Sequence, residues 1–377
     1  MRTTDRRVKV AGAGAVASLA VAGLLGGCAQ TSAKLSAHDA VENLKKAKAA
    51  SFTLHIADPD GELQKSSTSA SDKRDAQIVA DSSLVVTVDP EGDQTLGQAG
   101  TATSAPSAST DPAKSLAHSG TFAMVWKHGG KDVATLRSIE GVLYAKLDPA
   151  AYQEATGTAL PLDAESAAMF SSVVEGIKAG KWLRLDLTSV YSKLQAAGLN
   201  KSSPLGTTQP DPAVARRLAS ELLGAASVAT TVSKDGGTTK VDWSADVRKT
   251  LDAWLEILQK PEYAKLFGAA SSSITAQKST IDQLPGTPVT GTLTVKDKHL
   301  TQATLDLSSV VALSKDPESI AHVKTSKLVV DIDDSPAAVT APSADDVVQL
   351  DQLVDLALGG LKQFGSAAAP SSGAVTD

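Results

Sequence analysis

The fold is decided around residues 120–147, which read GTFAMVWKHGGKDVATLRSIEGVLYAKL. Three runs rich in β-branched and aromatic residues stand here: Gly120–Lys127, Asp132–Ile139 and Val142–Leu147. Between them lie only His-Gly-Gly at 128–130 and Glu-Gly at 140–141. Short glycine-containing turns of this kind join antiparallel neighbours. The stretch therefore predicts a three-stranded antiparallel meander.

Further strands are predicted on both sides of the meander. They lie near residues 51–56, 83–88, 181–187, 227–234, 238–243, 289–296, 300–307 and 326–332. Helical spacing of apolar residues predicts helices near 36–50, 188–197, 244–260 and 343–364, and a further one beginning at Asp211-Pro212. Strand pairs joined by short turns, with helices grouped apart from them, predict an α+β fold. Because about eleven strands are too many for a flat sheet, we expect a strongly curved antiparallel sheet with helices covering its concave face.

The domain organisation follows from shifts in composition along the chain. Residues 1–27 are expected to be a signal peptide, 28–35 a tether, 36–334 the folded domain, and 335–377 a C-terminal amphipathic helix with a disordered tail. Two insertions within the domain, near 63–73 and 91–114, are rich in small polar residues and hold few large apolar ones. Such segments cannot bury enough surface to order themselves, so we expect both to be disordered.

The N-terminus has the pattern of a secretory signal. Arg2, Arg6, Arg7 and Lys9 precede an uncharged run of 16 residues, Val10–Leu25. This run is shorter than the roughly 20 apolar residues that span a bilayer as a helix. The pair Arg6-Arg7 weakly resembles a twin-arginine signal, which leaves the general secretory and the twin-arginine routes both open.

The run ends in Leu25-Gly26-Gly27-Cys28, which resembles the bacterial lipobox and contains the only cysteine of the chain. A single thiol cannot form an intramolecular disulfide, so Cys28 needs another fate in an exported protein. The resemblance implies a diacylglyceryl group on Cys28 as the lipid anchor. Two or more acyl chains give stable membrane anchoring. We therefore expect the protein at the outer face of the cytoplasmic membrane.

Composition excludes several classes of partner. With 42 acidic and 36 basic residues the net charge is −6, which does not favour nucleic-acid binding. Aromatic residues make up 3% of the chain, too few for the stacking platforms that bind sugars or single strands. Any apolar binding site must therefore be aliphatic.

No segment carries a pattern typical of catalysis or of metal binding. The six histidines lack the spacing of metal ligands, and no Gly-x-Ser-x-Gly elbow or Walker loop occurs in the chain after the signal. We therefore assign no catalytic, metal or cofactor residues, and we expect a monomer that is not an enzyme.

Three phrases, together with the order of the elements, resemble a known group of proteins. They are Gly141-Val-Leu-Tyr-Ala-Lys146, Gly180-Lys-Trp-Leu-Arg-Leu-Asp186 and Val339-Thr-Ala-Pro-Ser-Ala-Asp345. Over about residues 37–350 the chain resembles actinobacterial envelope lipoproteins, which are similar to the mycobacterial lipid-carrying lipoproteins and to the LolA carrier fold. The resemblance implies a half-barrel whose mouth is plugged by helices, with an acyl-chain cavity in some members. The two polar insertions and the C-terminal helix depart from those carriers, so cavity size and ligand identity do not transfer.

Alternation with period two assigns a set of aliphatic residues to one face of their strands. The set is Leu54, Leu183, Leu185, Leu187, Leu293, Val295, Leu305, Leu307 and Val330. We expect these side chains to line an apolar cavity that binds or carries a lipid or glycolipid. The alternative is a structural or protein-interaction envelope lipoprotein whose core is filled by its own side chains, and both hypotheses share every one of these sequence features.

Overall fold

A computed structural model describes residues 32–65, 67, 69–90, 92–101, 120–160, 164–196, 212–263, 278–314 and 323–351. The chain divides into two compact units. Unit 1 comprises Met1–Ala105, Lys127–Gly130 and Thr208–Ala337, and unit 2 comprises Pro106–Trp126, Lys131–Thr207 and Ala338–Asp377.

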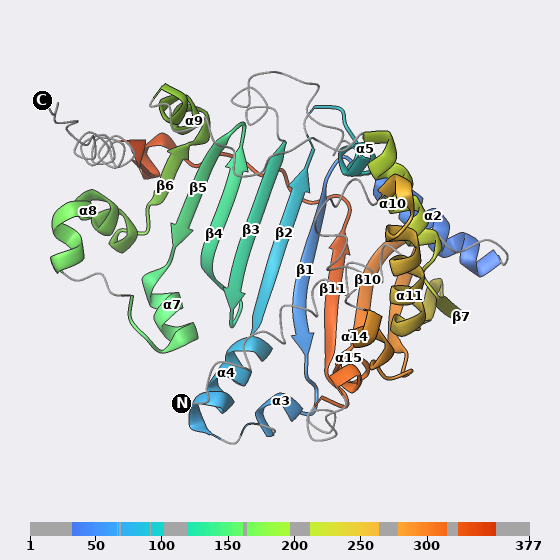
Figure 1. Ribbon diagram of the computed structural model, residues 1–377. Helices are drawn as coiled ribbons and strands as arrows, with labels where there is room; N and C mark the ends of the chain where they lie inside the picture. The colour runs from blue at the N-terminus through green and yellow to red at the C-terminus, as the bar shows by residue number, and fades with distance from the viewer. Residues whose placement is uncertain are drawn as a thin grey trace, which may run out of the picture. The chain divides into compact units, whose positions relative to one another are not determined.

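Unit 1 contains seven strands among its described residues. They are β1 (Ala50–Ala57), β2 (Ser82–Asp89), β7 (Val228–Asp235), β8 (Thr238–Ala245), β9 (Val289–Lys296), β10 (His299–Asp306) and β11 (Lys327–Asp333). They are ordered β2-β1-β11-β10-β9-β8-β7, and every neighbouring pair is antiparallel (Figure 1). One of the two neighbours of β1, strand β11, therefore comes from residues more than 250 positions further along the sequence.

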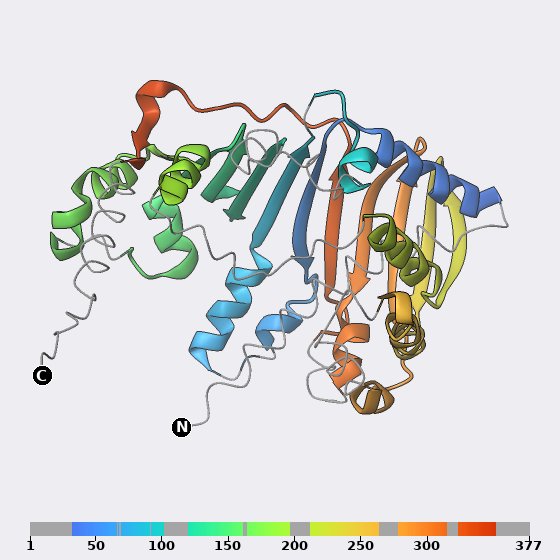
Figure 2. The ribbon, with the colours of Figure 1, turned by 45° about the horizontal axis from the view of Figure 1, so that its top comes forward.

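The helices of unit 1 contact different parts of this sheet. They are α2 (Ser32–Lys46), α3 (Glu62–Lys65), α4 (Ala70–Ala80), α5 (Leu96–Thr101), α10 (Pro212–Gly224), α11 (Val247–Leu258), α14 (Lys278–Asp282), α15 (Leu307–Val311) and the 3-10 turn η1 (Ala312–Ser314). Helix α2 crosses β8, β9 and β10 (Figure 2). Helices α3 and α4 pack on each other, and α4 contacts β1 and β2.

Unit 2 is built on the predicted meander. Its strands are β3 (Thr121–His128, whose last two residues belong to unit 1), β4 (Lys131–Ile139), β5 (Val142–Leu147), β6 (Trp182–Asp186) and β12 (Val347–Gln349), in the order β12-β6-β5-β4-β3. Its helices are α7 (Pro149–Thr156), α8 (Ala164–Lys178), α9 (Leu187–Ala196) and the 3-10 turn η2 (Ala344–Asp346). Strand β12 pairs with β6 in parallel, unlike the other pairs described.

The predicted fold class is confirmed. The described residues contain twelve strands where about eleven were predicted, their pairing is mostly antiparallel, and the class is α+β. The meander strands β3, β4 and β5 start and end within one residue of the prediction. Among the residues that the structure describes, none of the helices has the length and apolar character needed to cross a bilayer.

The predicted disorder near 63–73 is wrong, because α3 and α4 occupy most of that segment. Asp58 caps α3 by accepting hydrogen bonds from the backbone N–H groups of Glu62 (2.9 Å) and Leu63 (3.0 Å). Ser69 caps α4 by accepting one from Asp72 (3.0 Å). Polar composition here reflects helix capping rather than disorder.

The predicted disorder near 91–114 is wrong over residues 96–101, which form α5. Thr95 and Gln98 form a reciprocal capping box: the Gln98 N–H donates to Thr95 Oγ1 (3.3 Å) and the Thr95 N–H donates to Gln98 Oε1 (2.9 Å). The backbone N–H of Leu96 donates to the carbonyl oxygen of Ala47 (2.9 Å). Residues 102–114 lie outside the described part of the chain.

The predicted C-terminal helix is also wrong where it can be compared. Residues 344–346 form η2 and 347–349 form β12, whereas the rest of the predicted helix, 352–364, lies outside the described residues. Instead, the β-branched residues Val347 and Val348 belong to a short strand that pairs with the free edge of β6. The first helix, α2, starts at Ser32, within the segment 28–35 that was expected to be a tether.

Glu221 links α10 to the residues that follow α11. It accepts hydrogen bonds from Lys260 Nζ (2.6 Å), Tyr263 Oη (2.8 Å) and Arg217 Nε (3.1 Å). Tyr263 is fully buried. The hydrogen bond from Lys260, followed by that from Tyr263, lowers the pKa of Glu221 to about 2 from an ordinary value of 4.5.

This shift leads to a pH prediction. Because the pKa of Glu221 is lowered on folding, its stabilising contribution is complete above pH 4.5 and is lost as the pH falls through about 2. We expect Glu221→Gln to lower the melting temperature by several degrees at pH 7 and to weaken the pH dependence of stability between 4.5 and 2. Glu256→Gln removes a carboxylate from an exposed position of α11 and serves as the control. Equal thermal melts for both variants across this range would contradict the account.

Candidate apolar binding site

The strand register of unit 1 separates an apolar from a polar face. Side chains of directly paired residues point to the same side of a sheet. Leu54 pairs with Val330, Val330 with Ala303, and Ala303 with Leu293. The same face continues through Val241 to Val232 on β7 and through Leu84 on β2. One continuous aliphatic face therefore runs across all seven strands of unit 1.

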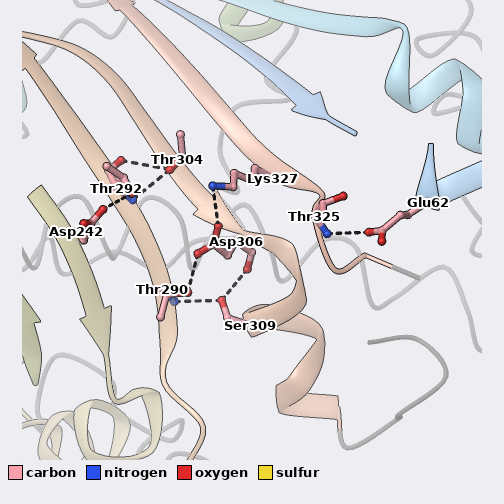
Figure 3. Close-up of polar contacts among 9 residues, drawn as sticks. All are labelled: Glu62, Asp242, Thr290, Thr292, Thr304, Asp306, Ser309, Thr325 and Lys327. Atoms are coloured by element: carbon pink, nitrogen blue, oxygen red, sulfur yellow. Dashed lines mark hydrogen bonds and ion pairs between the residues drawn. The ribbon is translucent and has the colours of Figure 1, made fainter. Parts of the chain in front are cut away.

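The other face is polar and is fastened by hydrogen bonds between strands (Figure 3). Thr292 Oγ1 donates to Asp242 Oδ1 (2.7 Å), and Thr304 Oγ1 accepts from the Thr292 N–H (3.1 Å). Thr290 Oγ1 donates to Asp306 Oδ2 (2.7 Å). Thr304, Asp306 and Asp331 therefore lie on the side opposite the aliphatic residues.

Polar residues that directly precede β11 anchor the start of the α3–α4 segment. The Thr325 N–H donates to Glu62 Oε2 (2.7 Å; Figure 3), Thr325 Oγ1 donates to Asp60 Oδ2 (2.8 Å) and Ser326 Oγ donates to Asp58 Oδ1 (2.9 Å). Ser326 is buried, so its bond to Asp58 is shielded from water. These bonds hold the start of α3 to the residues that precede β11.

Over β8, β9 and β10 the apolar face is filled by the chain itself. Leu293, Val295 and Leu305 are only 2–3% exposed, and Ala40 and Val41 of α2 belong to the same cluster. Val310 and Leu313, from α15 and η1, also pack against it. Three of the predicted cavity residues are therefore core residues in contact with the protein's own helices.

Over β11, β1 and β2 the same face is less well covered. All nine large apolar residues here are partly exposed, and together we call them the β1 strip: Phe52, Leu54, Ile56, Leu84, Val86, Val88, Leu328, Val330 and Ile332. Among the described helices, α4 contacts β1 and β2, and α15 contacts β11. Leu328, Val330 and Ile332 pack at the margin of the cluster that α2 covers. The β1 strip is therefore less completely buried than the part of the aliphatic face over β8–β10.

Unit 2 carries its own apolar face. Leu183 and Leu185 of β6 pair with Ala145 and Leu143 of β5 and are partly exposed. Helix α8 approaches this face closely: a Cβ atom built on Gly176 would lie 2.7 Å from Val348 Cγ2 and 3.8 Å from Leu183 Cδ2. Arg184 and Asp186 take the opposite side.

Two residues of the predicted site lie on other elements. Leu187 and Leu307 were placed at the ends of strands, but they are the first residues of α9 and α15. Asp186 and Asp306 immediately precede them, and the carboxylate of Asp186 accepts a hydrogen bond from the Ser189 N–H (3.0 Å). Capping of α9 by Asp186 explains why β6 ends before Leu187. Asp306 occupies the N-cap position of α15 without a side-chain capping hydrogen bond. The remaining predicted residues lie in both units: Leu183 and Leu185 in unit 2, and the others in unit 1.

Sequence reasoning missed most of the β1 strip. Strand β2 reads Ser-Ser-Leu-Val-Val-Thr-Val-Asp, where the apolar run at 84–86 obscures which residues share a face. The pairing of Leu84 with Leu54 and of Val86 with Phe52 settles this. The alternation of Phe52, Leu54 and Ile56 was already visible in the sequence. Cys28 lies outside the described residues.

Comparison with known proteins gives little further information. No protein-family model matches the chain, and no curated protein matches it at a significant level. Among solved structures, the crystal structure of the Mycobacterium tuberculosis lipoprotein LppX aligns with 82% of this chain and 97% of its own, at 9% identity and a TM-score of 0.28. At this TM-score the likeness supports no conclusion about ligand or function.

Proposed function

We propose that this protein is an extracytoplasmic lipoprotein that binds or carries a lipid or other apolar molecule. It is held at the outer face of the cytoplasmic membrane through diacylglyceryl Cys28, and it does not catalyse a reaction. The observation that carries the proposal is the uneven covering of one aliphatic face. Residues of β8–β10 are closed off by α2, whereas the β1 strip stays partly exposed. The lipobox-like end of the signal sequence supports the anchor.

An acyl chain fits the chemistry of the β1 strip. The strip is aliphatic apart from Phe52, and the hydroxyl and carboxylate groups of its strands lie on the opposite face. Each methylene removed from water contributes about 0.8 kcal/mol, so a few methylenes are enough to offset part of the cost of association.

Filling the strip should reduce binding. We expect Leu54→Trp to lower the affinity for a pyrene-labelled phospholipid about tenfold, because the indole displaces roughly two methylenes of the chain. Binding is measured by titrating the delipidated protein and following pyrene fluorescence.

The neighbouring residue supplies a matched control. Thr53→Trp introduces the same side chain on the same strand, but on the polar face. It is expected to bind the probe as the wild type does. Equal loss of binding in both variants would show that the effect comes from damage to β1 and would remove the β1 strip from the proposal.

A second candidate function is a structural or protein-interaction lipoprotein with a self-filled core. The closed packing of Leu293, Val295 and Leu305 against α2 favours it. It differs from the carrier proposal in one measurable respect, since it requires no uptake of lipid by the delipidated protein.

A further inference from the structure

Strands β4, β5 and β6 of unit 2 lie side by side (Figure 1), and they bring two cationic side chains close to one aromatic ring. The Arg137 guanidinium carbon lies 4.5 Å from the centroid of the Trp182 ring, and Lys146 Nζ lies 5.9 Å from it. Arg137 is on β4, Lys146 on β5 and Trp182 on β6. The register places Arg137 opposite Tyr144 and Tyr144 opposite Arg184, so these side chains share the polar face of unit 2.

Arg137 and Lys146 differ from nearby cations in how their charge is balanced. Lys131 pairs with Glu154 at 2.6 Å, and Arg184 lies 3.7 Å from Asp186 and 3.9 Å from Asp351. Among the described residues neither Arg137 nor Lys146 has a carboxylate partner. Arg137 Nη1 instead donates to the backbone carbonyl oxygen of Thr340 (2.7 Å).

The chain has more acidic than basic residues, yet neither Arg137 nor Lys146 is paired with a carboxylate among the described residues. Two like charges held beside one ring repel each other, and an exposed anion placed between them relieves that repulsion. The guanidinium keeps further N–H donors beyond the one bound to Thr340, and the ammonium keeps its three. The Trp182 ring restricts both side chains, which lowers the entropy lost when they bind.

We infer that Arg137, Lys146 and the Trp182 ring form a binding site for a phosphate-type oxyanion. Arginine binds such a group in a bidentate manner, and lysine adds a point charge. The oxyanion comes either from free phosphate or from the headgroup of an anionic phospholipid. The inference does not rest on the proposed function, because the β1 strip belongs to unit 1.

The first arm of the test uses inorganic phosphate. We titrate it into the full chain carrying Cys28→Ser and follow the indole N–H signals in nitrogen–proton NMR spectra, with Trp182 assigned from a Trp182→Phe sample. The Trp182 signal should shift saturably at millimolar phosphate. Lys146→Gln should weaken the binding at least about threefold, as expected for one lost charge-assisted contact at an exposed site.

Two further variants separate a built site from general charge. Lys131→Gln removes an equal charge from β4 at a carboxylate-paired lysine and should leave phosphate binding unchanged. Arg137→Lys keeps the charge without the planar fork and should bind more weakly than the wild type. Equal weakening by Lys146→Gln and Lys131→Gln would overturn the inference.

The second arm compares vesicles of phosphatidylglycerol with vesicles of phosphatidylcholine, using the same chains without the acyl anchor in a flotation assay. Binding to phosphatidylglycerol alone that is lost in Lys146→Gln assigns the headgroup as the source. A phosphate response without vesicle binding assigns a soluble oxyanion. If neither arm gives a response that depends on Lys146, the site does not exist, whatever the outcome of the acyl-chain experiments.

Discussion

Replacing Cys28 by serine is expected to move the protein from the membrane fraction to the soluble fraction. The acyl chains of a diacylglyceryl cysteine contribute about 0.8 kcal/mol per buried methylene, so their loss changes the membrane partition coefficient by many orders of magnitude. The acidic excess of the chain gives little compensating attraction to anionic lipid.

The measurement is fractionation of cells followed by detection of the protein. Gly27→Ala keeps a small residue before Cys28 and should remain in the membrane fraction. A Cys28→Ser protein that is found in the membrane fraction with unchanged processing would show that the protein is not anchored through this cysteine.

A Gly291→Ala variant is expected to lose about 3 kcal/mol or more of unfolding free energy. An ideal Cβ at this position would lie 2.0 Å from the backbone oxygen of Thr304 and 2.6 Å from Trp243 Cζ2. Trp243 is 4% exposed and packs in the core under α2. Overpacking usually costs 1–3 kcal/mol, and here the backbone carbonyl cannot move aside as a flexible side chain would.

Trp243 has little freedom to accommodate the added methyl group. Its Nε1 is buried and makes no hydrogen bond within the described residues, so the ring is held by packing alone. Urea unfolding followed by tryptophan fluorescence measures the loss. Gly286→Ala is the control, because an added Cβ there meets nothing within 4 Å. An equal midpoint for Gly291→Ala and Gly286→Ala would show that β9 and Trp243 are not packed as described.

Local patterns were sufficient to predict eleven of the twelve described strands, but not β12. The meander of β3–β5 and the pair β7–β8 follow from alternation and glycine-containing turns, and the pair β9–β10 follows from alternation on both sides of the short turn Asp297-Lys298. Long-range pairings were not predictable in this way. The antiparallel pairing of β1 with β11 and the parallel pairing of β12 with β6 depend on residues far apart in the sequence.

The candidate site was only partly predictable for a related reason. Alternation placed Leu54, Leu293 and Val330 on one face, and the register agrees. It could not show which helix covers which strand, because Leu293 under α2 and Leu54 in the β1 strip have the same sequence pattern. Asp186 ends β6 early by capping α9, a local competition that strand periodicity does not reveal.

The central claim is that the delipidated protein takes up lipid on a partly open aliphatic face. Native mass spectrometry of the full chain carrying Cys28→Ser, mixed with a phospholipid and a glycolipid, tests it most directly. The account predicts a one-to-one lipid adduct that Leu54→Trp diminishes and Thr53→Trp leaves intact. A wild-type chain that takes up neither lipid would contradict the carrier function and would favour the structural lipoprotein with a self-filled core.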